Sequence, residues 1–307
     1  MTLSKLILGI STLALLSCGD KKAKVPAYIS IDHIDLETTS KEGSNLHKIT
    51  DVWLTLNGLY IGTYELPCKV PVLKYGKQKL TLRAGILMNG IYATRSAYTV
   101  FDLAQGVDLD GNDIDEITLT ADSVTYLNAK VKYKEDIEVR IIEDYETAGD
   151  SFESIELKDV TTPDTAIYSA DYVETTDVDL VYEGKTSGMI KLTEEKHTIL
   201  LTLNEDDPLD VPKQGFNYME VDYKTDVDLT FGLWFNDPQK TQAPRHGLRP
   251  TDEWKKVYLH IIPEQVNNSE SPIQATKYRP YMLAKLPDGM KEGYIYLDNI
   301  KVIHENE

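Results

Sequence analysis

Apolar and polar residues alternate along most of the chain with a period of two rather than the 3.6 of a helix. The clearest case is "VWLTL" at 52–56, which Asn57-Gly58 separates from a second alternating run, "LYIGTYEL", at 59–66. Two such runs joined by Asn-Gly predict a β-hairpin, because both turn residues must take a positive φ. Similar runs predict strands at 78–84, 116–120, 128–133, 137–142, 198–203, 217–223, 228–235, 255–262 and 294–303. No segment combines a sustained helical period with caps, so the sequence predicts an all-β protein.

Turn spacing divides the chain into two predicted domains. Residues 27–137 hold short strands with turn residues about every ten positions, which is the pattern of an Ig-like β-sandwich. The sequence has no Cys-Trp-Cys core there, so antibody-type membership is not indicated. The strand at 137–142 ends in acids and a polar loop follows, so we expect a boundary near 138 and a second domain over 138–307.

Four landmarks follow in order in the second domain: "EDYE" (143–146), "YEGKTSGMIKL" (182–192), "WKKVYLHI" (254–261) and "YIYLDNIKVI" (294–303). Their order resembles the jelly-roll, galactose-binding-like modules of many carbohydrate-binding proteins. The resemblance implies a jelly-roll β-sandwich for residues 138–307. It also implies a structural calcium shared by an acid at the end of the first strand and an acid of the closing strand, which map to Glu146 and Asp298. The alternative is that these are exposed acids at strand ends, with a bulge at Asn299 turning Asp298 to water.

The N-terminus carries an apolar run, Leu6–Leu16, of 11 residues. A membrane-spanning helix needs about 20. The run ends in Leu-Leu-Ser-Cys at 15–18, which resembles the lipobox of bacterial lipoprotein signal peptides. The resemblance implies that residues 1–17 are removed, that Cys18 carries lipid, and that 18–26 tether the body to the outer membrane of a Gram-negative bacterium, on a face the sequence does not specify. The alternative is an ordinary signal peptide that contains a cysteine.

The second cysteine of the chain, Cys68, is left without a partner for a disulfide, and we expect a half-buried thiol near a strand end.

The formal net charge of −18 becomes −19 when residues 1–17 leave, because they contain Lys5 and no acid. This balance argues against nucleic acid as a partner and against a basic patch for anionic lipid.

Two local clusters carry candidate chemistry. The insert "NDPQKTQAPRHGLRP" (236–250) brings basic residues between two tryptophans. We treat it as a candidate ligand or partner site made by Trp234, Arg245, His246 and Arg249, with Trp254 alongside. The alternative is that the tryptophans are structural and the arginines offset nearby acids. "DLDGNDIDE" (108–116) has its glycine at the wrong position for an EF-hand, which favours an acidic turn.

The sequence contains no nucleophile elbow, no His-Glu-x-x-His pair and no phosphate-binding loop, so we do not expect an enzyme. Two hypotheses remain. The first is a lipid-anchored, non-catalytic interaction or accessory subunit of an outer-membrane protein complex. The second is a surface lipoprotein that binds a glycan through its jelly-roll domain. No cofactor is predicted beyond the calcium.

The lipid anchor gives the first testable prediction. Cys18→Ala should leave uncut precursor and abolish membrane association, because thiol acylation precedes cleavage in the lipoprotein family that the signal resembles. Membrane fractions washed at high pH and probed by immunoblot measure both effects. A variant that stays firmly in the washed membranes would contradict the anchor.

Overall fold

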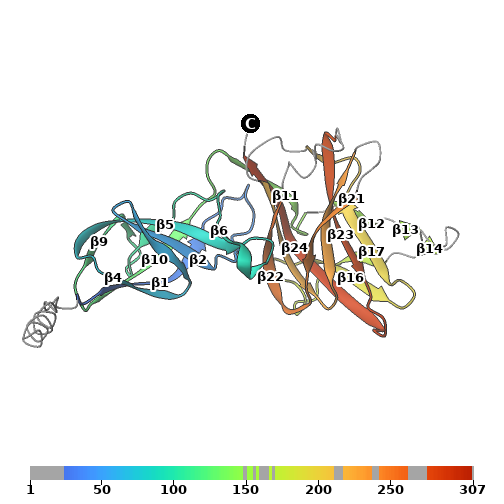
Figure 1. Ribbon diagram of the computed structural model, residues 1–307. Helices are drawn as coiled ribbons and strands as arrows, with labels where there is room; N and C mark the ends of the chain where they lie inside the picture. The colour runs from blue at the N-terminus through green and yellow to red at the C-terminus, as the bar shows by residue number, and fades with distance from the viewer. Residues whose placement is uncertain are drawn as a thin grey trace, which may run out of the picture.

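The computed structural model describes residues 24–147, 151–154, 157–158, 166–167, 170–210, 217–236, 242–261 and 275–305. The strands form two β-sandwich domains that lie end to end (Figure 1). The predicted all-β fold of two successive β-sandwiches is confirmed. Cys18 and the predicted signal peptide lie outside the described residues. In the part of the chain that is described, no helix is long and apolar enough to cross a membrane.

The N-terminal domain is built from β1 (Ala27–Leu36), β2 (Asp51–Leu56), β3 (Leu59–Glu65), β4 (Cys68–Val72), β5 (Gly76–Leu87), the short helix η1 (Tyr92–Thr94), β6 (Arg95–Ala97), β7 (Gln105–Val107), β8 (Asp113–Ile114), β9 (Glu116–Leu119) and β10 (Val124–Val131). One sheet has the order β4-β1-β10-β7-β8, and the other β3-β2-β5-β6 with β9 paired to β5. β1 and β10 run parallel, and their apolar residues form one hydrophobic cluster with those of β2 and β5.

Both turns analysed from the sequence have the expected local structure. Asn57 and Gly58 take φ values of 50° and 76°, which confirms the predicted hairpin between β2 and β3. In "DLDGNDIDE", Asp108 Oδ1 accepts backbone N–H groups of Asp110 and Asn112, each at 2.9 Å. This stretch is therefore a hairpin turn between β7 and β8, as the turn interpretation predicts.

The C-terminal domain contains β11 (Ile137–Glu143), β12 (Phe152–Ser154), β13 (Leu157–Lys158), β14 (Ala166–Ile167), β15 (Asp171–Thr175), β16 (Ser187–Thr193), β17 (Thr198–Leu203), β18 (Leu209–Asp210), β19 (Asn217–Thr225), β20 (Leu229–Phe235), β21 (Gln242–Leu248), β22 (Thr251–His260), β23 (Lys277–Lys285) and β24 (Glu292–Glu305). One sheet has the order β15-β16-β24-β19-β22, with β11 paired to β24; we call it the front sheet. The back sheet has the order β12-β17-β23-β20-β21, with β18 paired to β23. A second hydrophobic cluster fills the space between them.

A β-bulge divides the closing strand β24 into two halves. Asn299 takes a φ of 49°, and the register with β19 shifts between Glu220 and Asp222. The extra residue reverses the alternation, so Ile300 faces the core although it shares sequence parity with Asp298. The bulge expected at Asn299 is therefore present. Asp298 is nevertheless 1% exposed and does not reach water.

The N-terminal domain packs against one half of the front sheet's outer face, the face turned away from the core of the C-terminal domain. Tyr218 on β19, Tyr258 on β22 and Ile303 on β24 belong to the hydrophobic cluster of the N-terminal domain. The Lys48 N–H donates to Tyr258 Oη at 2.8 Å, and the Asn89 N–H donates to the Tyr258 carbonyl at 2.8 Å. The apolar core of the N-terminal domain therefore continues into the interface.

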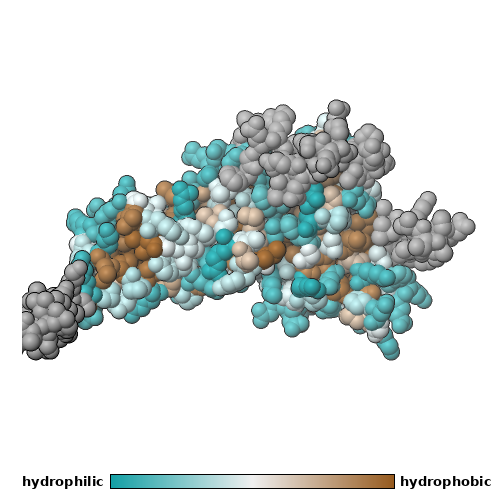
Figure 2. Space-filling model, in the orientation of Figure 1, coloured by the Kyte–Doolittle hydropathy of each residue, from teal (hydrophilic) through white to brown (hydrophobic). Residues whose placement is uncertain are grey.

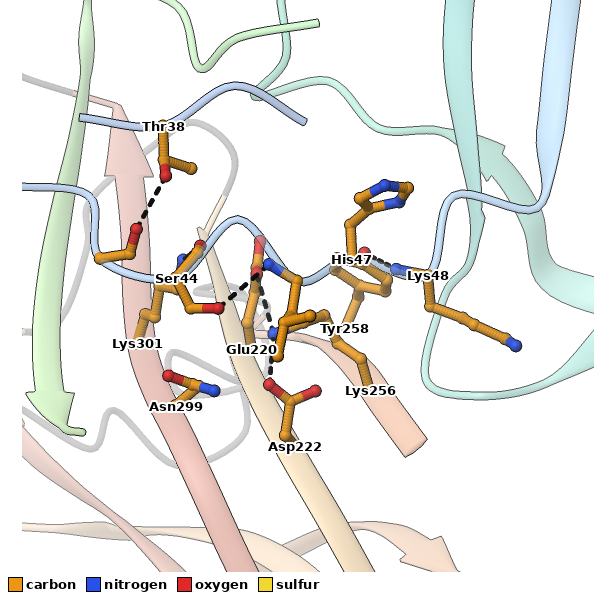
Figure 3. A network of polar contacts seen from close by, with 12 residues as sticks. Thr38, Ser44, His47, Lys48, Glu220, Asp222, Lys256, Tyr258, Asn299 and Lys301 are labelled. Carbon is orange, nitrogen blue, oxygen red and sulfur yellow. Dashed lines mark hydrogen bonds and ion pairs between the residues drawn. The ribbon is translucent and has the colours of Figure 1, made fainter. Parts of the chain in front are cut away.

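Buried charges lie at the centre of this interface (Figure 3). Lys256 Nζ is 2.9 Å from Asp222 Oδ2 and 3.8 Å from Glu220 Oε2. Glu220 Oε1 also accepts the hydroxyls of Tyr98 and Tyr133, at 2.9 and 3.0 Å, from the N-terminal domain. Burial alone would lower the pKa of Lys256, but the Asp222 and Glu220 carboxylates raise it, so the ammonium stays charged.

Lys301 supplies the second buried ammonium. Its Nζ donates to the backbone carbonyls of Glu42 and Ser44 at 2.9 and 2.8 Å, in the segment that joins β1 to β2. Burial lowers the pKa of Lys301, and the Glu220 carboxylate opposes that shift. Two acids and two lysines are thus buried together where the domains join.

We expect Glu220→Gln to destabilise the chain by roughly 3–5 kcal/mol, because it removes one of the two carboxylates that pair with the buried Lys256 ammonium. The amide keeps an oxygen that can accept both tyrosine hydroxyls, so the variant tests charge rather than shape. Urea denaturation of the soluble chain measures the free energy of unfolding.

The control is Lys196→Met, which breaks the ion pair between Lys196 and Asp171. The two side chains are 41% and 70% exposed, respectively. An exposed pair of this kind contributes about 0–1 kcal/mol. A Glu220→Gln variant no less stable than the control would show that the buried charges are not needed at the interface.

Candidate ligand site

The half of the outer face that the N-terminal domain leaves open carries four large aromatic residues, Tyr182, Trp254, Tyr294 and Tyr296, which we call the aromatic row. Strand alternation explains their position: Ile295 and Leu297 of β24 point into the core, so Tyr294 and Tyr296 point out. None of the four belongs to either hydrophobic cluster. Three of them are half-buried, and Tyr296 is 8% exposed.

The rings of the aromatic row lie close to one another across three segments of the chain. Tyr182 stacks on Trp254 with centroids 4.8 Å apart and an interplanar angle of 21°. Trp254 is 6.3 Å from Tyr296, whose ring is nearly parallel to that of Tyr294, also at 6.3 Å. The row therefore runs from the loop before β16 across β22 to β24.

Lysines and an acid border the aromatic row. Lys191 Nζ lies 5.2 Å from the centroid of the Tyr294 ring, and Lys224 Nζ lies 5.9 Å from that of Tyr296. Lys191 also pairs with Glu292 at 2.8 Å. Asp226 Oδ2 accepts the backbone N–H of Tyr294 at 3.1 Å. The site thus combines flat apolar rings with charged groups that can donate and accept hydrogen bonds.

Two carboxylates hold the loop that carries Tyr182. Glu146 Oε1 accepts the N–H groups of Lys185 and Thr186, at 2.6 and 3.0 Å. Gly184 makes this approach possible, since its φ is 68° and an added Cβ would lie 2.3 Å from that oxygen. The loop that begins at Tyr182 is therefore fixed over the front sheet by side chains from other segments.

Asp298, on β24 of the front sheet, binds the same loop. Its Oδ2 accepts the Ser187 hydroxyl at 2.5 Å and the Glu183 N–H at 3.4 Å, and its Oδ1 accepts the Asn299 N–H at 2.8 Å. Ser187 Oγ in turn accepts the Tyr182 N–H at 3.0 Å. Burial raises the pKa of Asp298 to about 7, with the hydrogen bonds opposing the shift.

Glu146 and Asp298, the residues of the calcium prediction, thus bind one loop through protein N–H and O–H donors. The described residues contain no group of three or more His, Cys, Asp or Glu side chains that could hold a metal ion. Two carboxylates whose oxygens already accept these hydrogen bonds do not fit the several oxygen ligands that calcium requires. The calcium site stays a prediction, and no step below depends on it.

The structure places Trp234, Arg245 and His246 of the other predicted cluster on the paired strands β20 and β21 of the back sheet, and separates the flanking Trp254 from them. Trp234 lies on β20 of the back sheet, where the Arg279 guanidinium sits 5.0 Å from its ring centroid, whereas Trp254 lies on the front sheet. Arg245 and His246 lie on β21, and burial lowers the pKa of each.

Arg249 completes that set. Its guanidinium pairs with Asp228 at 3.1 Å, with both side chains exposed. None of the four predicted site residues belongs to the aromatic row. Trp254, which the sequence places beside them, does.

Comparison with known proteins finds no matching family model and no significantly similar curated protein. Solved structures with a similar fold include a family 29 carbohydrate-binding module, at 12% identity and a TM-score of 0.34, covering 55% of this chain and 88% of that one. A second is a carbohydrate-binding module of the beta-sandwich superfamily, at 16% identity and a TM-score of 0.37, covering 91% and 98%. A third is the CBM22-1 xylan-binding domain of Paenibacillus barcinonensis Xyn10C, at 16% identity and a TM-score of 0.36, covering 56% and 96%. At these low values the similarities identify neither a family nor a ligand for this chain.

The pKa of Asp298 predicts how stability depends on pH. A native pKa of about 7, above the usual aspartate value of 3.8, means that ionisation is less favourable in the folded chain. The stabilisation from this group is complete below about pH 4 and is lost as the pH rises towards 7, by at most about 4 kcal/mol.

Asp298→Asn should remove this contribution, because the amide does not ionise. The melting temperature of the native chain minus that of the variant, measured from pH 4 to 8, should fall as the pH rises. Asp252→Asn, at an exposed position, serves as the control. A flat difference across the range would contradict the raised pKa.

Proposed function

We propose that this chain is a glycan-binding lipoprotein whose C-terminal domain binds sugar on the aromatic row. The observation that carries the proposal is the grouping of four aromatic rings outside both hydrophobic clusters, on the open half of the front sheet's outer face. Large apolar residues grouped on a surface, and not used by a core, are typical of ligand grooves and interaction sites.

The chemistry of the row suits a sugar. Each sugar ring has an apolar face of C–H groups that packs on an aromatic ring, and a rim of hydroxyls that needs hydrogen-bond partners. Tyr and Trp offer both an apolar body and a polar end. Lys191 and Lys224 are donors beside the rings, and Asp226 adds an acceptor. The same class of ligand is named for the carbohydrate-binding modules described above, at a similarity too low to transfer it.

The front sheet is a better candidate than the back sheet. Trp234 has Arg279 over its ring, and that arginine is held by Glu153 and by the Leu203 carbonyl, at 2.7 and 3.1 Å. A guanidinium fixed in this way occupies space that a stacked sugar would need. The aromatic row instead has several rings that span three segments, and among the described residues no cation lies over the ring of Tyr182 or of Trp254.

The lipid anchor at Cys18 would hold this binding domain at the outer membrane. The hypothesis of a non-catalytic accessory subunit remains compatible with such an anchor, but no feature of the described residues points to a protein partner more directly than the aromatic row points to a sugar.

A glycan array probed with the soluble chain, residues 19–307, tests the proposal. We expect binding to a defined set of glycans that Trp254→Ala weakens by roughly tenfold or more, equal to about 1.4 kcal/mol. Titration calorimetry with the best array ligand measures the affinity.

Trp234→Ala is the matched control, since it removes the same side chain from the opposite sheet. Binding lost in Trp234→Ala and kept in Trp254→Ala would move the site to the back sheet. A silent array and no calorimetric signal with any glycan would reject glycan binding.

A further inference from the structure

The outer end of the N-terminal domain, where the described chain begins, exposes apolar residues that no core uses. Val25, Leu59, Leu73 and Tyr75 are 49%, 54%, 56% and 42% exposed. Figure 2 shows hydrophobic surface at this end of the N-terminal domain. We call these four residues and the neighbouring Lys74, Lys77 and Lys79 the tether end.

Hydrogen bonds connect the segments of the tether end. Tyr75 Oη donates to the Val25 carbonyl at 2.6 Å, and Gln78 Nε2 donates to the Tyr75 carbonyl at 2.8 Å. Asn57 Nδ2 then donates to Gln78 Oε1 at 2.9 Å, which brings in the β2–β3 turn that precedes Leu59. Three segments distant in sequence therefore form one surface beside the chain start.

The charge of the tether end differs from that of the whole chain. Lys74, Lys77 and Lys79 are exposed, and none is within 4 Å of a carboxylate among the described residues. Glu116 is the register partner of Lys79, and Asp122 is also at this end, with its N–H bonded to the Pro26 carbonyl. Lys74 and Lys77 have no acid as register partner. The net charge of −18 therefore does not describe this surface.

We propose that the tether end rests on an anionic phospholipid bilayer, with Leu59, Leu73 and Tyr75 in the headgroup region and Lys74 and Lys77 at the lipid phosphates. The proposal rests on acylation of Cys18. Val25 follows Cys18 by seven residues, and at about 3.6 Å per residue this length reaches no more than about 25 Å. An acylated chain therefore holds this surface within a short distance of the bilayer. Apolar and aromatic side chains flanked by lysines suit that boundary, because the lysine stems lie along apolar surface while the ammonium groups reach the headgroups.

The test uses the acylated mature chain in vesicles of equal parts phosphatidylglycerol and phosphatidylcholine. In a Cys68→Ser background, a nitroxide is attached at Leu73→Cys or, as control, at Ile91→Cys. Ile91 is 49% exposed but lies beyond the far end of β5, near the second domain. We expect oxygen, which concentrates in the bilayer, to speed relaxation of the label at 73 more than an aqueous nickel chelate does. For the label at 91 we expect the nickel chelate to have the larger effect.

Equal access of the nickel chelate to both labels would overturn the proposal, and so would a chain that does not float with the vesicles. A second label, at Leu59→Cys, repeats the measurement in case the first variant does not fold. Lys74→Glu combined with Lys77→Glu should expose the label at 73 to the chelate, whereas Lys285→Glu combined with Lys291→Glu should not. Shielding that survives the first pair would overturn the role given to the lysines. Glycan binding by the soluble chain is measured separately, so failure here leaves that result unchanged.

Discussion

The arrangement of this protein depends on the need to neutralise charges buried on the outer face of one sheet. Glu220, Asp222 and Lys256 share that face because side chains alternate along β19 and β22. In an isolated sandwich they would lie in water at little cost. Here the N-terminal domain covers them, and a buried charge without a partner is strongly unfavourable. In the observed placement of the domains Lys256 pairs with both acids, and two tyrosine hydroxyls and two backbone carbonyls of the N-terminal domain bind Glu220 and Lys301.

The bulge at Asn299 makes this placement compatible with a ligand site on the same sheet. Without it, Lys301 would have the parity of Ile295 and Leu297 and would point into the apolar core. The inserted residue sends Ile300 and Val302 inward and turns Lys301 and Ile303 towards the N-terminal domain. The first half of β24 keeps its tyrosines on the outer face. One strand therefore supplies both the aromatic row and part of the interdomain contact.

Local patterns in the sequence predicted local structure well and long-range structure poorly. The Asn57-Gly58 hairpin and the strand at 198–203 needed only alternation and turn chemistry, and both match the structure. The stacking of Tyr182 on Trp254 depends on a loop crossing the sheet, and it joins residues 72 positions apart (254 minus 182). Proximity in sequence instead grouped Trp234 with Trp254, although the chain changes sheets between them. Tyr294 and Tyr296 gave a usable signal, two aromatics at i and i+2 on a predicted strand, but their outward direction required knowing where the core lies.

A fixed interdomain angle gives the proposed anchor and the proposed ligand site a defined relation. A flexible tether of this length would let the body turn freely, so an anchor alone would not orient a binding face. Contact of the tether end with a bilayer would remove that freedom for the N-terminal domain. The buried charges and the shared apolar cluster would then fix the orientation of the C-terminal domain as well, because a rotation within the closed interface would leave Glu220 and Lys301 buried without their partners. In Figure 1 the two domains lie end to end, with the described chain beginning at the far end of the N-terminal domain. The aromatic row would thus stand away from the lipid at a distance set by the fold, where a glycan in solution or on another surface can reach it.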